Sequence, residues 1–292
     1  MKNGITNSKI STDNIADYCA PGTRFKEKMV SVADNVSLRV ITFSPAKPTN
    51  KPTVLFIPGW ISLMKGWKIV LKEMTNDFNI IYAETREKIT SQVIGKAEFS
   101  VEAIAQDIVK LVEIYKLKKN EYIIFGSSLG GTSILESYQE LQQKPLCFAL
   151  LGPNAEYRTP WWGKILISII WPQLYNMLKP FIKWYLRKFR LDIESDKAQY
   201  DKYCNALDAA DPKKLKPAAK ALSIYKVWDI LKNIDLPVLI IGATKDLLHE
   251  PQNLIQMNKM LPNSVFLDME TNTFAHGPEM VEELRKYIGS LK

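Results

Sequence analysis

Ten residues near the middle of the chain constrain its fold more than any others. The run Tyr122–Phe125 is aromatic or β-branched, as in a buried strand, and small residues follow it directly. A helical pattern begins immediately afterwards. The segment therefore predicts a strand that enters a helix through a sharp turn centred on Ser128, with Gly126 and Gly130 small enough to let the two elements pack closely.

Two other interpretations of this turn are weaker. Ser127 is the rival turn residue, but its neighbours two positions away are Phe125 and Leu129, which are too large for so sharp a turn. A phosphate-binding loop would need a Gly-x-x-x-x-Gly-Lys-Ser/Thr or Gly-x-Gly-x-x-Gly pattern, and neither is present. The turn is therefore interpreted as a nucleophile elbow at Ser128.

Length and composition set broad limits. The 292 residues, with 46% hydrophobic and 24% charged side chains, suit a globular chain of one large or two small domains. The segment Met1–Asp13 is polar, which predicts no signal peptide and residence in the cytoplasm. Cys19, Cys147 and Cys204 lack any metal-ligand spacing and are expected to be reduced, and only His249 and His276 are available. We therefore expect no metal and no cofactor.

The net charge of +8 comes mainly from one segment. Residues 161–191 contain six basic side chains and no acidic one, and removing those six from the 39 basic residues leaves 33 against 31 acids. No nucleic-acid-binding motif accompanies them, so nucleic acid is not an expected partner. The six are Lys164, Lys179, Lys183, Arg187, Lys188 and Arg190.

Strand and helix patterns alternate along the chain. This alternation predicts an α/β fold with a mostly parallel, eight-stranded sheet flanked by helices. Besides the strand that leads to Ser128, we expect strands at 25–32, 36–43, 53–57, 78–83, 146–151, 237–241 and 264–269, and helices at 66–77, 100–117, 129–142 and from 278 onward.

The strand rhythm stops for about eighty residues after 152, which indicates an inserted helical cap. The predicted organisation is an N-terminal extension over 1–22, a core formed by 23–152 and 232–292, and a cap over 153–231.

Two later motifs complete a recognisable order. Ile240–Asp246 follows a strand, and Phe274–Pro278, which contains His276, follows the last strand. With Ser128 ahead of them, these segments resemble the α/β-hydrolase family over nearly all of residues 25–291. The resemblance implies Ser128 as nucleophile, His276 as general base and Asp246 as the acid that orients the imidazole. His249 remains an alternative base and Asp268 an alternative acid.

The same resemblance implies an oxyanion hole formed by the backbone N–H groups of Leu129 and Trp60. Two departures from the family pattern are present. Pro58-Gly59 stands where many relatives have His-Gly, and the charged run 84–91 replaces a glycine-rich turn. We expect this run to be a solvated or ion-paired loop.

The predicted cap is rich in aromatic residues. On a helical wheel of residues 174–190, the lysines and arginines fall in one arc and the apolar side chains lie opposite. Pro180 suits a first turn, which predicts a helix that starts near Lys179. Two interpretations remain open: the apolar face roofs the core while the lysines stay in water, or the cap is a lid that contacts an anionic membrane surface. Trp60, Trp161, Trp162 and Phe181 are candidate pocket residues for an apolar acyl or aryl group.

The resemblance implies a serine hydrolase that cleaves small carboxylic esters through an acyl-enzyme, similar to monoglyceride lipases and related carboxylesterases. The same residues would serve an acyltransferase, a thioesterase, a lactonase or a carbon–carbon bond hydrolase. A non-catalytic binding protein on this fold is the third class of interpretation. Acyl length and oligomeric state do not follow from the sequence.

Overall fold

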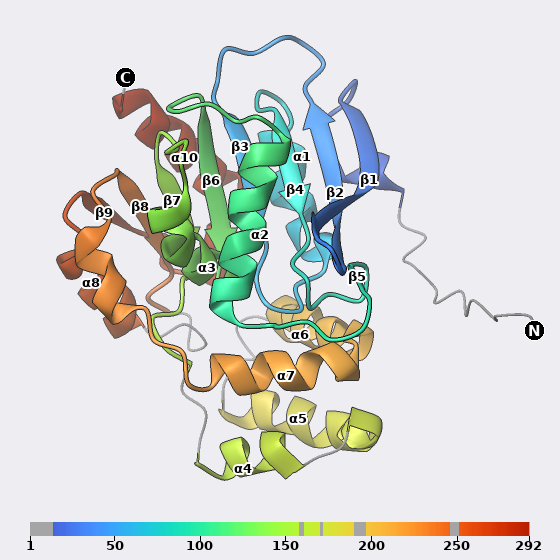
Figure 1. Cartoon of the computed structure of the whole chain (residues 1–292). Helices are drawn as coiled ribbons and strands as arrows, with labels where there is room; N and C mark the ends of the chain where they lie inside the picture. The colour runs from blue at the N-terminus through green and yellow to red at the C-terminus, as the bar shows by residue number, and fades with distance from the viewer. Residues whose placement is uncertain (1–13, 158–160, 170–171, 190–196, 246–250, 292) are drawn as a thin grey trace, which may run out of the picture.

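The computed structural model describes residues 14–157, 161–169, 172–189, 197–245 and 251–291. After a 3-10 turn, η1 (Ile15–Tyr18), comes the predicted hairpin, in which β1 (Arg24–Ala33) pairs with β2 (Val36–Ser44) in antiparallel register. Strand β2 then pairs antiparallel with β4 (Ile80–Ala83). The hairpin thus extends one edge of the central sheet (Figure 1).

The remaining neighbours along the main path of the sheet are parallel, whereas the short β5 (Gln92–Val93) pairs antiparallel with β2. The order along the main path is β1-β2-β4-β3-β6-β7-β8-β9. The mostly parallel sheet is confirmed, with β5 as an addition to the eight predicted strands. The parallel strands are β3 (Thr53–Ile57), β4, β6 (Tyr122–Ser127), β7 (Phe148–Leu151), β8 (Val238–Gly242) and β9 (Ser264–Asp268).

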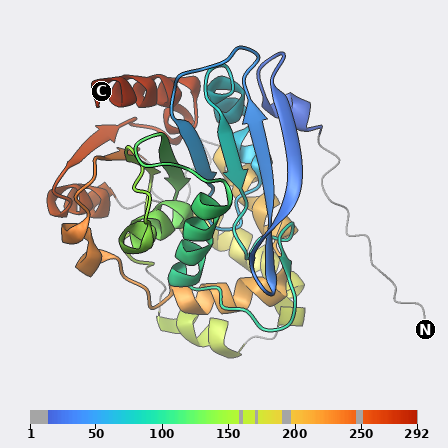
Figure 2. The same ribbon diagram turned by 45° about the horizontal axis from the view of Figure 1, so that its top comes forward.

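Both faces of the central strands are buried, which explains their continuous apolar runs. Successive residues of β3 point to opposite faces, so Val54 and Phe56 pack with helices α1 and α10, whereas Leu55 and Ile57 pack with α2, α3 and α8. Figure 2 shows the twisted sheet between these helical layers. The flanking helices are α1 (Lys68–Met74), α2 (Val101–Ile114), α3 (Leu129–Ser137), α8 (Pro251–Met260) and α10 (Pro278–Ser290).

Several predicted helix ends were too long. The helix expected at 66–77 begins as a 3-10 turn, η2 (Met64–Trp67), and its α-helical part ends at Met74. Helix α3 ends at Ser137 and passes into the 3-10 turn η3 (Tyr138–Glu140) rather than reaching residue 142. The start of α2 is as predicted, because the Ser100 hydroxyl accepts a hydrogen bond from the Ala103 N–H at 3.2 Å.

Four helices between β7 and β8 lie together beyond the carboxyl edge of the sheet (Figures 1 and 2). We call these four the cap helices. Near the two ends of the insertion, Glu156 and Lys226 form an antiparallel bridge, and the Val227 N–H donates to the Ala155 carbonyl at 2.9 Å. The limits of the predicted domains remain a prediction. The cap helices are α4 (Trp161–Ile169), α5 (Tyr175–Phe189), α6 (Lys197–Ala209) and α7 (Pro212–Leu222).

The predicted start of α5 near Lys179 is wrong. The helix begins at Tyr175, directly after the 3-10 turn η4 (Pro172–Leu174), and Pro180 lies inside it. Proline removes the N–H that would bond to the Asn176 carbonyl. Asn176 is exposed, so water can satisfy that carbonyl and the helix continues through the proline.

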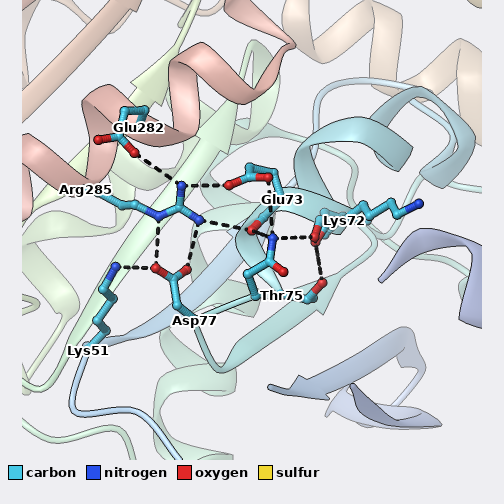
Figure 3. Close-up of polar contacts among 9 residues, drawn as sticks. Lys51, Lys72, Glu73, Thr75, Asp77, Glu282 and Arg285 are labelled. Atoms are coloured by element: carbon cyan, nitrogen blue, oxygen red, sulfur yellow. Dashed lines mark hydrogen bonds and ion pairs between the residues drawn. The ribbon is translucent and has the colours of Figure 1, made fainter. Parts of the chain in front are cut away.

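Arg285 links the last helix, α10, to acidic residues at the end of α1 and just after it (Figure 3). Arg285 of α10 binds both carboxylate oxygens of Asp77, at 2.9 and 3.1 Å, and the Glu73 side chain at 2.8 Å. Lys51 also pairs with Asp77, and Glu282 lies 3.5 Å from the guanidinium. Because α10 starts two residues after His276, this network also fixes the segment that carries the histidine.

None of the described helices combines the length and apolar composition needed to cross a membrane.

We expect Arg285→Met to lower the free energy of unfolding by about 2 kcal/mol, since it removes charge-assisted hydrogen bonds to two carboxylates in a half-buried position. Equilibrium unfolding in urea measures the change. Lys286→Met is the matched control, because the Lys286–Glu283 pair on the same helix is largely exposed and such pairs contribute little. Equal unfolding midpoints for both variants would contradict this role of Arg285.

Candidate active site

The turn between β6 and α3 has an unusual backbone. Ser128 adopts φ 49° and ψ −117°, a combination that L-residues rarely occupy. Two hydrogen bonds hold it there: its N–H donates to the Leu151 carbonyl at 2.9 Å, and its carbonyl accepts from the Thr132 N–H at 3.0 Å. Ser127, by contrast, is the buried last residue of β6. The turn residue is therefore Ser128.

Close packing around the turn leaves no room for larger residues. A Cβ added at Gly130 would lie 2.2 Å from the Ile57 carbonyl oxygen, and one at Gly126 would lie 2.9 Å from the Gly130 carbonyl carbon. Both glycines are thus required by contact between backbones, as expected for positions two before and two after the turn residue.

The Ser128 hydroxyl has a partner that the sequence analysis did not identify. The Asn154 side-chain amide donates to Ser128 Oγ at 2.7 Å. The backbone of Asn154 is itself fixed by the Thr132 hydroxyl, which lies 2.8 Å from its carbonyl oxygen and 3.1 Å from its nitrogen. Asn154 follows β7, the strand next to β6, so the strand order was the signal that could have placed it beside the turn.

The start of α3 and the loop after β3 both lie beside Ser128. Leu129 is the first residue of α3, and N–H groups in the first turn of a helix have no partner within the helix. Gly59, in the loop after β3, lies against the turn, since a Cβ there would be 3.2 Å from Ser128 Cβ. Trp60 follows it and packs on the apolar cluster that contains Leu129 and Leu222, its buried indole N–H lacking a partner among the described residues.

The loop that contains Trp60 is strained and is held by a buried lysine. Ile61 has φ 47°, which is unfavourable for a β-branched residue. The Lys88 ammonium donates to the Gly59 carbonyl at 2.7 Å and to the Ser62 carbonyl at 2.9 Å, one at each end of this tight turn. Burial lowers the pKa of Lys88, and the nearby Glu87 carboxylate opposes that shift. A single side chain thus fixes the predicted second oxyanion donor.

Of the two alternatives expected for the charged run 84–91, the structure shows the ion-paired one. Residues 84–88 are all buried. Arg86 makes two hydrogen bonds to Asp107, at 2.7 and 2.6 Å, and Arg39 reaches Glu84 at 3.4 Å. Burial raises the pKa of Asp107 although Arg86 opposes the rise. The sequence shows that these residues are charged but not that they are buried, because α2 and the cap helices exclude water from them.

A cap helix is anchored to this loop. Lys214 of α7 donates to the Lys88 carbonyl at 2.7 Å and to the Ser91 carbonyl at 2.5 Å. The cap, the charged loop and the Trp60 loop therefore form one hydrogen-bonded unit.

His276 follows the last strand and a short helix, α9 (Asn272–Ala275). Its Nδ1 lies 3.0 Å from the Asn272 carbonyl oxygen, and its ring centroid lies 5.0 Å from that of Trp67. Trp67 in turn donates to the Ser62 hydroxyl at 2.9 Å. With Nδ1–H donating to that carbonyl, Nε2 is the ring nitrogen that can accept a proton.

The predicted acid Asp246 and the alternative base His249 lie outside the described residues. The alternative acid Asp268 is exposed, and both of its oxygens are used nearby: Oδ1 accepts from the Thr244 and Glu270 N–H groups, and Oδ2 accepts from the Thr244 hydroxyl. Burial alone would raise the pKa of Asp268, but these hydrogen bonds outweigh it and hold the pKa below its usual value. Asp268 thus stabilises the loop after β8.

The candidate pocket residues are not gathered in one place. Trp60 is beside the turn, whereas Trp161 and Phe181 are exposed on the cap, with 75% and 46% of their surfaces accessible. The Trp162 side chain lies outside the described part of the structure.

Within the described ranges, no group of three or more His, Cys, Asp or Glu side chains is arranged to hold a metal ion. Cys147 is buried, which raises the pKa of its thiol to about 12.

Comparison with protein-family models and with curated proteins finds no match. Solved structures do match. An esterase from Thermogutta terrifontis superposes with a TM-score of 0.71 at 18% identity, covering 91% of this chain and 99% of its own. The chain has the α/β-hydrolase fold. A hydrolase from Oleispira antarctica and an enol-lactonase from Burkholderia xenovorans LB400 each give a TM-score of 0.71, at 16% and 14% identity, covering 90% of this chain and 99% of theirs.

Within the α/β-hydrolase fold, the turn at Ser128 lies where a nucleophile elbow is expected, at the carboxyl end of a central strand. The sequence-based resemblance to this fold is therefore confirmed. At these identities the likeness establishes the architecture of the chain.

We expect Gly130→Ala to lower the free energy of unfolding by about 3 kcal/mol or more, because the new methyl group would overlap the Ile57 carbonyl. Gly289→Ala is the matched control: its Cβ meets nothing within 4 Å, and alanine is the better helix former, so stability should be unchanged or rise by up to about 1 kcal/mol. Urea unfolding of both variants measures the difference, and similar stabilities would contradict the close packing at the elbow.

Proposed function

We propose that this protein is a serine hydrolase that cleaves carboxylic esters with an apolar acyl or aryl group. The observation that carries the proposal is the strained backbone of Ser128, whose positive φ is maintained by packing that only Gly126 and Gly130 allow. Strain of this kind persists where the surrounding structure enforces it, and such sites are often functional. The esterase and lactonase structures that share the fold support the same class of reaction.

In the proposed mechanism, Ser128 Oγ attacks the ester carbonyl while His276 Nε2 takes the hydroxyl proton. The alcohol leaves with that proton, and an acyl-enzyme remains on Ser128. Water then attacks the acyl-enzyme, with His276 again as base, and releases the acid. Asp246 is proposed to stabilise the imidazolium, and the Asn272 carbonyl, 3.0 Å from Nδ1, favours the same tautomer.

Two backbone groups are proposed to bind the oxyanion. The N–H of Leu129 has the additional advantage of the positive end of α3, and the N–H of Trp60 belongs to the loop that Lys88 holds. The Asn154 amide donates to Ser128 Oγ, which leaves the serine O–H proton available for His276. The proposed acyl pocket rests on Trp60 and its apolar neighbours Leu129 and Leu222.

A fluorophosphonate probe is expected to label the wild-type protein on Ser128. Ser128→Ala should abolish labelling, and Ser127→Ala is the matched control that should retain it. Mass spectrometry of the digested adduct locates the site. Absence of labelling, or labelling that survives in Ser128→Ala, would overturn the assignment of the nucleophile.

The substrate class is tested by rates on p-nitrophenyl esters of graded chain length, beside monoacylglycerols and thioesters. An apolar pocket predicts a kcat/KM that rises from acetate to longer acyl groups. A rate that is highest for acetate would contradict the apolar acyl group but leave the hydrolase assignment in place. Partition of the acyl group between water and added alcohols distinguishes hydrolysis from acyl transfer.

Lys88 is proposed as a positioning residue for the oxyanion loop. Its removal alone would take from the buried Glu87 carboxylate the ammonium that lies 3.8 Å away, so the comparison is made in a Glu87→Gln background. Lys88→Met in that background should lower kcat about tenfold or more with a smaller change in KM, because a misplaced N–H weakens transition-state binding. Glu87→Gln alone is the control. An equal kcat for Glu87→Gln with and without Lys88→Met would contradict the positioning role of Lys88.

A further inference from the structure

Exposed apolar side chains gather at one end of the molecule. Of the sixteen large apolar side chains exposed in the described part of the chain, seven lie between residues 161 and 189. We call these seven the aromatic tip. They are Trp161, Ile165, Leu174, Met177, Phe181, Trp184 and Phe189.

The aromatic tip belongs to the outer layer of the cap. Helix α4 packs on α7, and α5 packs on α6. Figure 1 shows α4 and α5 beyond α7, on the side away from the sheet. Met177 and Trp184 keep 77% and 51% of their surfaces accessible, so these residues do not roof the core. An exposed cluster of this size on a globular protein indicates a binding surface.

The orientation of α5 is set by polar contacts on its other face. The Tyr175 hydroxyl donates to the Leu207 carbonyl at 2.8 Å. The Lys183 ammonium binds both oxygens of Asp208, at 2.8 and 2.7 Å, and Lys179 lies 3.9 Å from the same carboxylate. The expectation that the lysines face water while the apolar side faces the core is therefore wrong. Lys179 and Lys183 turn inward to α6, whereas Phe181, Trp184 and Phe189 turn outward.

The exposed aromatic rings also support one another. Phe181 stacks on Trp184 with centroids 5.6 Å apart, and Trp184 meets Phe189 edge-on at 5.7 Å. This contact gives the tip a continuous apolar ridge along α5. Large rings held in this way favour the boundary between water and an apolar phase.

The charged side chains of the segment that carries the ridge are all basic. Lys164, Arg187 and Lys188 are exposed in the same segment, and residues 161–189 contain no aspartate or glutamate. A two-fold contact between two copies through this ridge would bring these like charges together. The aliphatic side chains Ile165 and Met177 would gain nothing from a phosphate backbone alone. Apolar area flanked by cations instead matches a surface that is apolar inside and anionic outside.

We propose that the aromatic tip binds the surface of an anionic lipid bilayer, with α5 lying in the interface and its rings inserted among the headgroups. The sequence allowed membrane contact through the Trp residues and the basic stripe of the cap together. In the structure, Lys179 and Lys183 of that stripe contact Asp208 of α6, whereas Arg187 is exposed, as are Lys164 and Lys188. The proposed contact therefore involves the aromatic tip, with Lys164, Arg187 and Lys188 as the cations. The proposal does not depend on the chemistry at Ser128.

Co-sedimentation with vesicles tests the proposal on the full-length protein. Vesicles of phosphatidylcholine alone are compared with vesicles of equal parts phosphatidylcholine and phosphatidylglycerol, at low and high sodium chloride. We expect strong binding to the anionic vesicles, weaker binding as salt rises, and little binding to the neutral ones.

Two pairs of variants separate the apolar and the charged contributions. Phe181→Gln with Trp184→Gln, and separately Arg187→Glu with Lys188→Glu, should each weaken binding about tenfold or more. The matched controls are Ile69→Gln, an exposed apolar residue of α1, and Lys118→Glu with Lys119→Glu, exposed cations before β6, which should bind within about twofold of the wild type. The substituted side chains of the tip are exposed, and thermal melting verifies that the variants fold.

Equal binding to neutral and anionic vesicles would overturn the proposal, as would tip variants that bind like the wild type. Sedimentation velocity tests the alternative that the aromatic tip binds a second copy of the chain. A dimer that the Phe181→Gln and Trp184→Gln changes dissociate, in a protein that does not bind vesicles, would assign the tip to a second copy of the chain and overturn the lipid assignment.

Discussion

The contact between the backbone of α3 and the end of β3 is the constraint on which the rest of the site depends. Gly130 touches the Ile57 carbonyl so closely that no side chain fits. This contact forces the chain through an unfavourable conformation at Ser128, and it brings the loop after β3 against the turn. The Ser128 hydroxyl, the Asn154 amide and the loop that contains Gly59 are therefore neighbours because two backbones touch.

Buried charged side chains hold the Trp60 loop in its shape. The Trp60 loop contains a β-branched residue at positive φ, and it needs an external restraint to keep that shape. Lys88 supplies it from a loop in which Arg86 pairs with Asp107 and Glu84 pairs with Arg39. Buried charges cost desolvation energy, and their pairing offsets part of that cost. Lys214 then couples the same loop to the cap.

Sequence patterns predicted the sheet well and the helix ends poorly. Strand β3 and the start of α10 have the predicted bounds, because apolar runs and a proline at a first helical position are local signals. Helix α3 ended early, and Pro180 did not start α5, because packing and solvation of single carbonyls decide such points. Asn154 was missed because its closeness to Ser128 depends on strand order.

The sequence by itself determined that Ser128 occupies the turn, since only there do small residues stand two positions to either side. It also determined that α5 has an aromatic face and a basic face. Only the tertiary structure decided which face is covered, because Tyr175, Lys179 and Lys183 find their partners on α6, more than twenty residues later in the chain. A helical wheel records the two faces of a helix, but the partner that buries one of them is a property of the fold.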